Sequence, residues 1–385
     1  MIYLDNAAST QIHGEVLDAM LPYLKEQFGN PSSIHRYGRL GQKAIGKARK
    51  EVAKLINAEP SEILFTSGGT ESNNTALRGI GKKNLNSRII TSLIEHDAIL
   101  EPCKNLEKDG FDVVYLPVDK FGLVDPATLE NNLNENTSLV SIMFGNNEVG
   151  TIEPISEIAK ICRKRNIIFH TDAVQAVGKI PIDVKELGID LLSMSSHKIN
   201  GPKGVGALYV KNGISIDPII LGGGQEKGLR SGTENVANIV GFGKACEIAR
   251  LNLVNNISKM TELRNHLSNK ILKEISNVTL NGDPDKRLPN NVHLTFLGVN
   301  GEDLLIKLDE NGVAASTGSA CSVHIQKASH VLQAMGFSHE QITGSLRLTV
   351  GISNTIEEMD ETVKILKTVV EELRAVSPFK EKYSF

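Results

Sequence analysis

The chain has 385 residues, and its 42 Lys and Arg against 45 Asp and Glu give a formal net charge of −3. A hydrophobic fraction of 40% and a charged fraction of 23% exclude a largely disordered chain. The near-neutral balance gives no electrostatic reason to expect direct binding to nucleic acid or to a membrane. Because there is no long apolar run, no signal-peptide pattern and no C-x-x-C spacing among the four cysteines, we expect a cytoplasmic protein without a metal site.

Short apolar runs alternate with helical segments over the first two-thirds of the chain. A segment such as 155–165 carries apolar residues at helical spacing. The alternation predicts an α/β fold, with a mostly parallel sheet covered by helices on both faces. The predicted strands are 62–65, 88–94, 111–118, 138–144, 167–170, 191–194 and 205–210.

The pattern changes from about Cys246. A polar, helix-like stretch runs to Ser276, and an Asn-Gly-Asp-Pro turn follows it. Segments 291–296 and 345–350 predict strands of a smaller α+β unit that a helix over 356–375 closes. We therefore expect an N-terminal segment (1–15) that packs with the small domain, a large domain (16–250) and a small C-terminal domain (251–385).

Polar clusters follow five of the predicted strands at their carboxyl ends, which is where ligands bind in open α/β sheets. One such residue is more often a helix cap or a solvated side chain, but five clusters in the same position favour a single polar cleft. The clusters are the Gly-rich turn 66–74 and segments 95–96, 145–148, 171–175 and 195–198.

Lys198 is the strongest single candidate for covalent chemistry. It lies between a strand end and a Gly-Pro turn, where it could form a Schiff base with a carbonyl cofactor. Pyridoxal phosphate needs such a lysine, an acid beside its pyridine nitrogen and an anion site for its phosphate. Lys198, Asp172 and the turn 67–70 supply one part each, whereas Lys198 alone would be read as a surface lysine.

Cys321 lies in a stretch of small residues, 315–322, that predicts a loop. A cysteine there could be a nucleophile if its thiolate is favoured. The other cysteines, Cys103, Cys162 and Cys246, fall in helical segments, where we expect buried structural side chains.

Two short motifs offer weaker alternatives. His170-x-Asp172 matches part of an iron site with two histidines and one carboxylate. The Gly-rich segment 200–206 could suggest a nucleotide-binding loop, but it lacks the Lys-Ser/Thr ending of a Walker A motif and opens a strand.

Ten motifs stand along the chain: YLDNAA (3–8), FGNPSS (28–33), TSGGTESNN (66–74), EH (95–96), NNE (146–148), DAVQ (172–175), SSHK (195–198), RSGTEN (230–235), GSAC (318–321) and SLR (345–347). In content and order they resemble the group I (NifS/IscS-like) cysteine desulfurases, which are class V aminotransferase-like enzymes of pyridoxal phosphate fold type I. The resemblance covers essentially the whole chain. It implies a large domain with a mostly parallel seven-stranded sheet and a smaller α+β C-terminal domain.

The resemblance also implies roles toward pyridoxal phosphate. Lys198 would hold the cofactor as a Schiff base and act as the catalytic base, and Asp172 would pair with the pyridine nitrogen. His96 would stack on the ring, and Gln175 would hydrogen-bond the phenolic oxygen. The phosphate would be bound by Gly69, Thr70, Ser195 and His197, with Thr233 reaching in from the partner subunit of a homodimer.

The substrate implied by the resemblance is L-cysteine. Arg347, assisted by Asn147, would hold its carboxylate, and Asn147 would also contact the cofactor. Catalysis would release L-alanine and leave a persulfide on Cys321 for a sulfur-acceptor protein of iron–sulfur cluster assembly, tRNA thiolation or DNA phosphorothioation. The alternatives are a selenocysteine lyase or an aminotransferase of the same fold, for which Cys321 would be incidental, and a catalytically silent sulfur-relay subunit.

Overall fold

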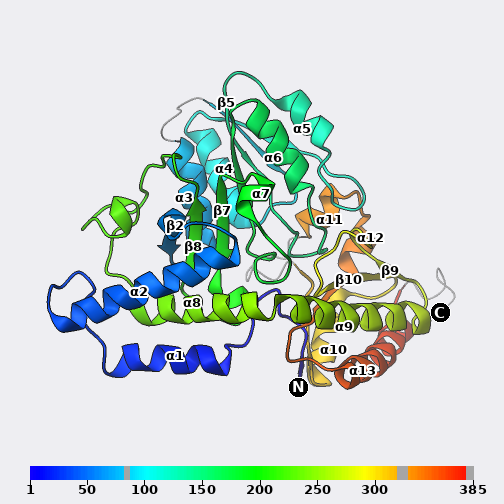
Figure 1. Ribbon diagram of the computed structural model, residues 1–385. Helices are drawn as coiled ribbons and strands as arrows, with labels where there is room; N and C mark the ends of the chain where they lie inside the picture. The colour runs from blue at the N-terminus through cyan, green and yellow to red at the C-terminus, as the bar shows by residue number, and fades with distance from the viewer. Residues whose placement is uncertain (82–86, 319–327, 379–385) are drawn as a thin grey trace.

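A computed structural model describes residues 1–81, 87–318 and 328–378 (Figure 1). Its centre is a seven-stranded sheet with the order β2-β8-β7-β6-β5-β3-β4. Strand β8 runs antiparallel to both of its neighbours, and the other pairings are parallel. The mostly parallel α/β fold is therefore confirmed. The strands are β2 (Ile63–Thr66), β3 (Arg88–Ser92), β4 (Asp112–Leu116), β5 (Thr137–Ser141), β6 (Ile168–Asp172), β7 (Leu191–Ser195) and β8 (Gly206–Val210).

Alternation along the strands divides the core of this sheet between its two faces. Leu64 and Leu191 belong to a hydrophobic cluster on one face, whereas the next residues, Phe65 and Leu192, belong to a larger cluster on the other. The first face is covered by α3 (Gly69–Gly81) and α4 (Asp97–Lys108). The helices on the second face are α1 (Gly14–Lys25), α2 (Arg36–Leu55), α5 (Pro126–Asn132), α6 (Ile155–Lys164), α7 (Val184–Leu187) and α8 (Val236–Leu251).

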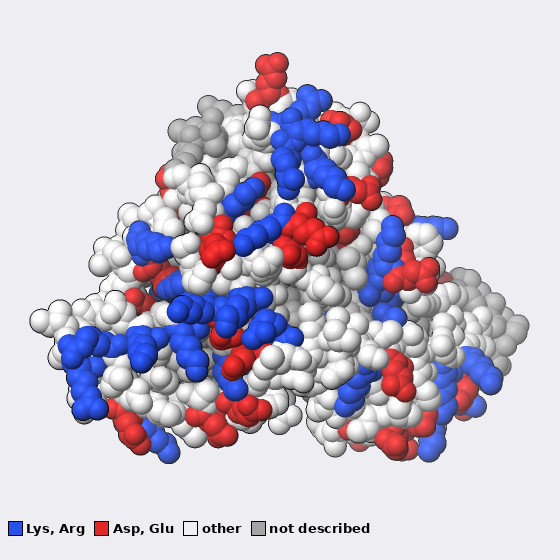
Figure 2. Space-filling model, viewed as in Figure 1, with Lys and Arg blue, Asp and Glu red and all other residues white. Residues whose placement is uncertain are grey.

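Helix α2 illustrates how the sequence directs packing on the second face. Ala44, Ile45, Ala48 and Val52 recur at spacings of one, three and four and are buried. The opposite side of the helix carries exposed cations, which gather at the lower left of the space-filling view (Figure 2). These are Arg36, Arg39, Lys43, Lys47, Lys50 and Lys54.

The C-terminal part has its own sheet and its own hydrophobic cluster. Strands β9 (Val278–Leu280), β10 (Asn291–Phe296) and β12 (Ser345–Thr349) pair antiparallel in the order β12-β10-β9. The N-terminal strand β1 (Ile2–Tyr3) pairs in parallel with β11 (Val313–Ala314), so the start of the chain joins this part. The helices of this part are α9 (Leu253–Glu274), α10 (Gly301–Glu310), α11 (His330–Ala334), α12 (His339–Thr343) and α13 (Ile356–Ala375).

The stretch from Cys246 to Ser276 is helical as predicted, but it contains a break that the sequence did not predict. Helix α8 ends at Leu251 and α9 begins at Leu253. Asn252 forms the joint, and its side chain donates to the carbonyl of Ile248. Cys246 therefore packs in the core of the large sheet, while α9 from Met260 onward packs in the second cluster. This change between clusters supports our proposed division into 16–250 and 251–385.

Three short strands, β1, β9 and β11, had no counterpart in the sequence prediction. Each has only two or three residues, which is too short for an alternating pattern to be recognised. In the described part of the chain, no helix is both long and apolar enough to cross a membrane.

Candidate active site

A cavity of about 330 Å³ lies at the carboxyl ends of the central strands. It contains the side chains that the sequence analysis selected from separate strand ends, together with Arg347 from the C-terminal sheet. The selected residues that line it are Gly69, Thr70, His96, Asn147, Asp172, Gln175, Ser195, His197, Lys198 and Arg347. The strand-end residues therefore share one cleft, as their sequence positions predict, and Arg347, which only the family resemblance suggested, joins them from β12.

Asp172 is the last residue of β6, and two donors hold its carboxylate in place. The side-chain amide of Asn73 on α3 donates to Oδ2 at 2.6 Å, and the backbone N–H of Val174 donates to Oδ1 at 3.0 Å. Asn73 also lines the cavity and was not singled out from the sequence. Its position in the Gly-rich motif, one helical turn after Gly69, is the signal that could have identified it.

His96 lies at the N-terminus of α4. Its Nδ1 accepts a hydrogen bond from the backbone N–H of Ala98 at 3.0 Å, so Nδ1 carries no proton and the imidazole orientation is fixed. The preceding residue, Glu95, is fully buried and accepts hydrogen bonds from Ser92 and from the backbone of Met143. Burial raises the pKa of Glu95 well above its usual value. Glu95 therefore anchors the turn that presents His96.

The Gly-rich turn leads directly into α3, so the helix begins at the cavity wall at Gly69 and Thr70. A Cβ on Gly206 of β8 would lie 2.7 Å from the Cα of Gly68, so only glycine lets the turn approach this strand so closely. Glu71 accepts a hydrogen bond from the backbone N–H of Ser67 at 2.8 Å. The unpaired N–H groups of a helix N-terminus favour anions, and this one faces the cavity.

Lys198 ends the 3₁₀ turn η2 (Ser196–Lys198) that follows β7. Its amine donates to the carbonyls of Ala7 and Ala8 at 2.6 and 2.7 Å, so the N-terminal segment lies against the lysine. His197 contacts the same segment, because its Nδ1 lies 3.2 Å from Oγ of Ser9. Burial, followed by the nearby positive charge of Lys198, lowers the pKa of His197 to about 4. A neutral His197 can therefore serve as a hydrogen-bond partner in the cavity.

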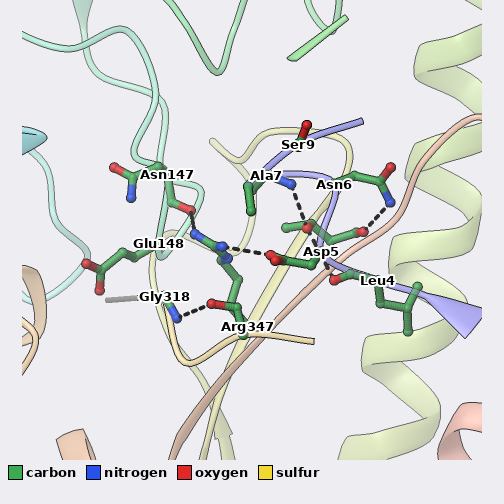
Figure 3. A network of polar contacts seen from close by, with 12 residues as sticks. Leu4, Asp5, Asn6, Ala7, Ser9, Asn147, Glu148, Gly318 and Arg347 are labelled. Carbon is green, nitrogen blue, oxygen red and sulfur yellow. Dashed lines mark hydrogen bonds and ion pairs between the residues drawn. The ribbon is translucent and has the colours of Figure 1, made fainter. Parts of the chain in front are cut away.

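Arg347 extends from β12 toward the large sheet (Figure 3). Its Nη2 forms an ion pair with Oδ1 of Asp5 at 2.9 Å, and its Nη1 donates to the backbone carbonyl of Asn147 at 2.9 Å. The side chain is 4% exposed, and its Nε has no hydrogen-bond partner among the described residues. A buried guanidinium with a remaining donor is well suited to bind a carboxylate. The motif at 3–8 contains Asp5, whose contact with Arg347 the sequence did not predict.

The charges around the cavity favour an anionic ligand. Asp172 is the one carboxylate among the described residues that line it, whereas Lys198 and Arg347 supply two cations. Pyridoxal phosphate fits this set of groups: Lys198 can bond to its aldehyde and Asp172 can face its ring nitrogen. The N-terminus of α3 can receive its phosphate.

Comparison with known proteins agrees with this geometry. The family model for class-V aminotransferases matches residues 2–362. The chain belongs to this family. It is 52% identical to the cysteine desulfurase IscS of Dictyoglomus turgidum, over 99% of this chain and 98% of that protein. Such similarity over nearly the full length places it among the cysteine desulfurases of the class-V family.

Two solved structures extend the comparison. A NifS-like protein matches with a TM-score of 0.91 and 39% identity, covering 96% of this chain and 99% of that one. The structure described as SspA in complex with cysteine matches with a TM-score of 0.82 and 38% identity, covering 92% of this chain and all of the other. The arrangement of both sheets is therefore that of NifS-like class-V enzymes.

Two expected site residues of this class-V chain, Thr233 and Cys321, are not among the described residues that line the cavity. Thr233 is exposed and lies outside the lining of the cavity of its own chain. Cys321 falls outside the described residues, although Gly318, the last described residue before that gap, lines the cavity.

The alternative iron motif is not supported. His170 is fully buried, and both ring nitrogens are engaged: Nδ1 lies 2.8 Å from Oγ of Ser141, and Nε2 lies 3.0 Å from Oγ of Ser193. Burial lowers the pKa of His170 to about 3. His170 therefore links β5, β6 and β7 as a neutral structural group and has no nitrogen left to bind a metal.

The helical cysteines are buried as the sequence predicts. Burial raises the pKa of the Cys103 and Cys162 thiols to about 12 and that of Cys246 well above its usual value. These three thiols are therefore poor nucleophiles at neutral pH.

Proposed function

We propose that this class-V enzyme uses pyridoxal phosphate to remove sulfur from L-cysteine and stores the sulfur as a persulfide on Cys321. The observation that carries the proposal is the meeting of Lys198, Asp172 and Arg347 around one cavity. An amine for a carbonyl cofactor, a carboxylate for its ring nitrogen and a guanidinium for the substrate carboxylate are the groups that this chemistry needs.

The sulfur transfer balances without an external oxidant or reductant. The Cys321 thiolate attacks the substrate sulfur, so that an S–S bond forms and the substrate Cβ–S bond breaks. The electron pair of the broken bond stays on Cβ, which takes up a proton. L-Cysteine and a protein thiol thus become L-alanine and a protein persulfide.

Proton transfer is the proposed task of Lys198. Its Nζ, held 2.6–2.7 Å from two backbone carbonyls, would take the proton from Cα of the substrate. Pyridoxal phosphate, when bound, supplies an electron sink for the negative charge left on Cα. Asp172, fixed by Asn73 and Val174, would accept the hydrogen bond of the cofactor's ring nitrogen. His96 would cover the ring.

Substrate orientation is the proposed task of Arg347. Asp5 and the Asn147 carbonyl hold its two Nη atoms, which directs the guanidinium, and Nε has no partner among the residues that the structure describes. A substrate carboxylate would thus meet a cation whose direction is already set.

The phosphate would be bound by groups at the carboxyl edge of the large sheet. These groups are Gly69 and Thr70 at the start of α3, Ser195 at the end of β7, and His197 in the turn η2. Because Thr233 is exposed and does not line the cavity of its own chain, we propose that it completes the phosphate site of a second copy of the chain in a homodimer. Sedimentation of the cofactor-loaded protein tests this, and a fully active monomer would contradict it.

The decisive experiment measures alanine and protein-bound persulfide from L-cysteine, in the wild type and in Cys321→Ala. Both products should fall to background in the variant, while the visible absorbance of bound pyridoxal phosphate is retained. Cys162→Ala is the matched control, because that thiol is buried and should leave both products unchanged. Undiminished alanine formation by Cys321→Ala would instead favour a selenocysteine lyase or an aminotransferase, and a chain that takes up no cofactor would favour a silent subunit.

The persulfide sulfur would then pass to an acceptor protein. Iron–sulfur assembly, tRNA thiolation and DNA phosphorothioation are the candidate pathways. Incubating the ³⁵S-labelled persulfide with an acceptor from each pathway distinguishes them, because the physiological acceptor should remove the label from Cys321 fastest.

A further inference from the structure

Lys179 is a buried cation behind the cavity wall. It lies in the turn between β6 and α7 and is 5% exposed. Its Nζ donates to the backbone carbonyl of Gln175 at 3.1 Å and to Oε1 of the same residue at 3.2 Å. In the described part of the chain, no carboxylate lies within ion-pair distance of this amine. Its charged neighbours are Lys198 and Arg347, and both are positive.

Such a position is unfavourable for a lysine. Burial, followed by the charges of Lys198 and Arg347, lowers the pKa of Lys179 to about 7. A methionine of similar length would fill the same space without that cost. An anion bound in the cavity would favour the charged form of this amine. A buried cation that meets no carboxylate among the described residues calls for an explanation beyond packing.

The hydrogen-bond capacities of the two side chains provide the explanation. A charged amine can only donate, so the oxygen of the Gln175 amide must face Lys179. The amide nitrogen then faces the opposite way, where it donates to the carbonyl of Ala7 at 2.9 Å, beside the cavity that Gln175 lines. Lys179 itself lines a separate crevice behind Lys198, bordered by Asn256 and Ile352, and so reaches the cavity through Gln175.

We propose that Lys179 is a positioning residue that fixes the Gln175 amide with its N–H groups, and not its oxygen, toward the phenolic oxygen of the cofactor. The inference rests on the proposed function, since it assumes pyridoxal phosphate in the cavity. Without Lys179, only the Ala7 carbonyl holds this orientation, so the amide can rotate more readily and place its oxygen against the anionic phenolic oxygen. Two acceptors that face each other repel, and the cofactor loses a donor that stabilises its negative charge.

The test is a pH titration of the visible absorption band of the loaded protein. We expect Lys179→Met to raise the midpoint by about one pH unit, the size of one lost hydrogen bond. Gln175→Leu should raise it similarly, and the double variant should match Gln175→Leu alone, because Lys179 acts through Gln175. Lys179→Arg, which also only donates, should keep the wild-type midpoint. Lys203→Met removes an exposed nearby cation and is the control for charge alone.

The outcomes separate the inference from the function on which it rests. If Lys179→Met protein is loaded and active but keeps the wild-type midpoint, the inference fails and the proposed function stands. The inference also fails if Lys179→Met shifts the midpoint by the same amount in the wild type and in the Gln175→Leu variant. A shift in Lys203→Met as large as that in Lys179→Met also overturns it, because charge would then be the cause. If the wild type takes up no cofactor, the proposed function fails and the inference fails with it. The melting temperature of the cofactor-free protein shows whether each variant folds. If Lys179→Met folds poorly, Lys179→Arg is the test. A raised midpoint in Lys179→Arg contradicts the inference.

Discussion

His170 and Asp172 lie two residues apart on β6 and point to the same face of the sheet, yet their surroundings differ. His170 lies in the middle of the sheet, and serines of both neighbouring strands use its two nitrogens. Asp172 lies at the strand end, where Asn73 and a backbone N–H hold a carboxylate that still faces the cavity. A buried polar group whose hydrogen bonds are all made within the protein stabilises the fold. A polar group that faces a cavity and can still form a further hydrogen bond is available for a ligand.

The same contrast separates the cations of the molecule. Arg49 forms an ion pair with Glu226, and both residues are partnered within the fold. Arg347 is also anchored through its Nη atoms, but its Nε has no partner within the described ranges of the chain. Lys198 lines the cavity and donates to two uncharged backbone carbonyls. Substitutions around the cavity should therefore affect chemistry more than stability, and substitutions in the sheet centre should do the opposite.

Replacing Lys198 should have the largest effect. We expect Lys198→Ala to lose turnover by at least about 10³-fold, because it removes the proposed base and the covalent anchor of the cofactor. Alanine release from L-cysteine measures the loss, and the circular dichroism spectrum should stay unchanged. Lys185→Ala, which breaks only an exposed pair with Glu59, is the control and should retain full activity. Comparable turnover in the two variants would remove Lys198 from the mechanism.

Arg347→Lys should have the next largest effect. The substitution keeps the positive charge but loses the planar guanidinium that Asp5 and Asn147 orient. The loss of one or two charge-assisted hydrogen bonds to the substrate should lower kcat/KM for L-cysteine by about 10- to 100-fold. Asp5→Asn keeps Arg347 and should give a smaller decrease. If Arg347→Lys stays within about threefold of the wild type, Arg347 does not hold the substrate.

His170 should affect the pH dependence of stability and not the chemistry. Its pKa is about 3 in the folded chain and about 6.5 when unfolded, so the unfolded chain binds the extra proton between these values. The free energy of unfolding should therefore fall as the pH drops below about 6.5, by on the order of 1–2 kcal/mol by pH 5 from this residue. His170→Asn should show a shallower fall in denaturant titrations at pH 7 and pH 5.

The control for His170 is His339→Asn, which changes an exposed histidine and should keep the wild-type pH slope. Equal slopes for wild type and His170→Asn would show that His170 carries a proton in the folded protein, contrary to its two serine contacts.

The smallest expected signal concerns the buried thiols. At pH 8, iodoacetamide should not label native Cys321→Ala protein, since Cys103, Cys162 and Cys246 are buried and have raised pKa values. The same protein in denaturant should take up three labels, which mass spectrometry can count. Rapid native labelling of any helical cysteine would show that its helix opens more readily than the packed core suggests.

Much of the fold could be predicted from the sequence because most of its strands are buried on both faces and contain short apolar runs. Strand β10 and helix α13 have the predicted bounds, 291–296 and 356–375, and the seven strands of the main sheet shift by only a few residues at their ends. The joint at Asn252 was missed because the helical pattern continues on both sides of it. At this joint the chain passes from the core of the large sheet to the C-terminal core. Which core a helix packs in depends on tertiary contacts, which the local sequence pattern does not show.

The site divides in the same way. By itself the sequence determined which side chains meet, because carboxyl ends of neighbouring strands lie at one edge of a sheet, and its motif order determined the family. Only the tertiary structure decided how those side chains are held: Asp172 by Asn73, Arg347 by Asp5, and Gln175 by Lys179. The first and second pairs join residues about 100 and 340 positions apart, and the third pair depends on which way an amide faces. Hydrogen-bond partners are set by distance and direction in three dimensions, which spacing along a chain does not encode.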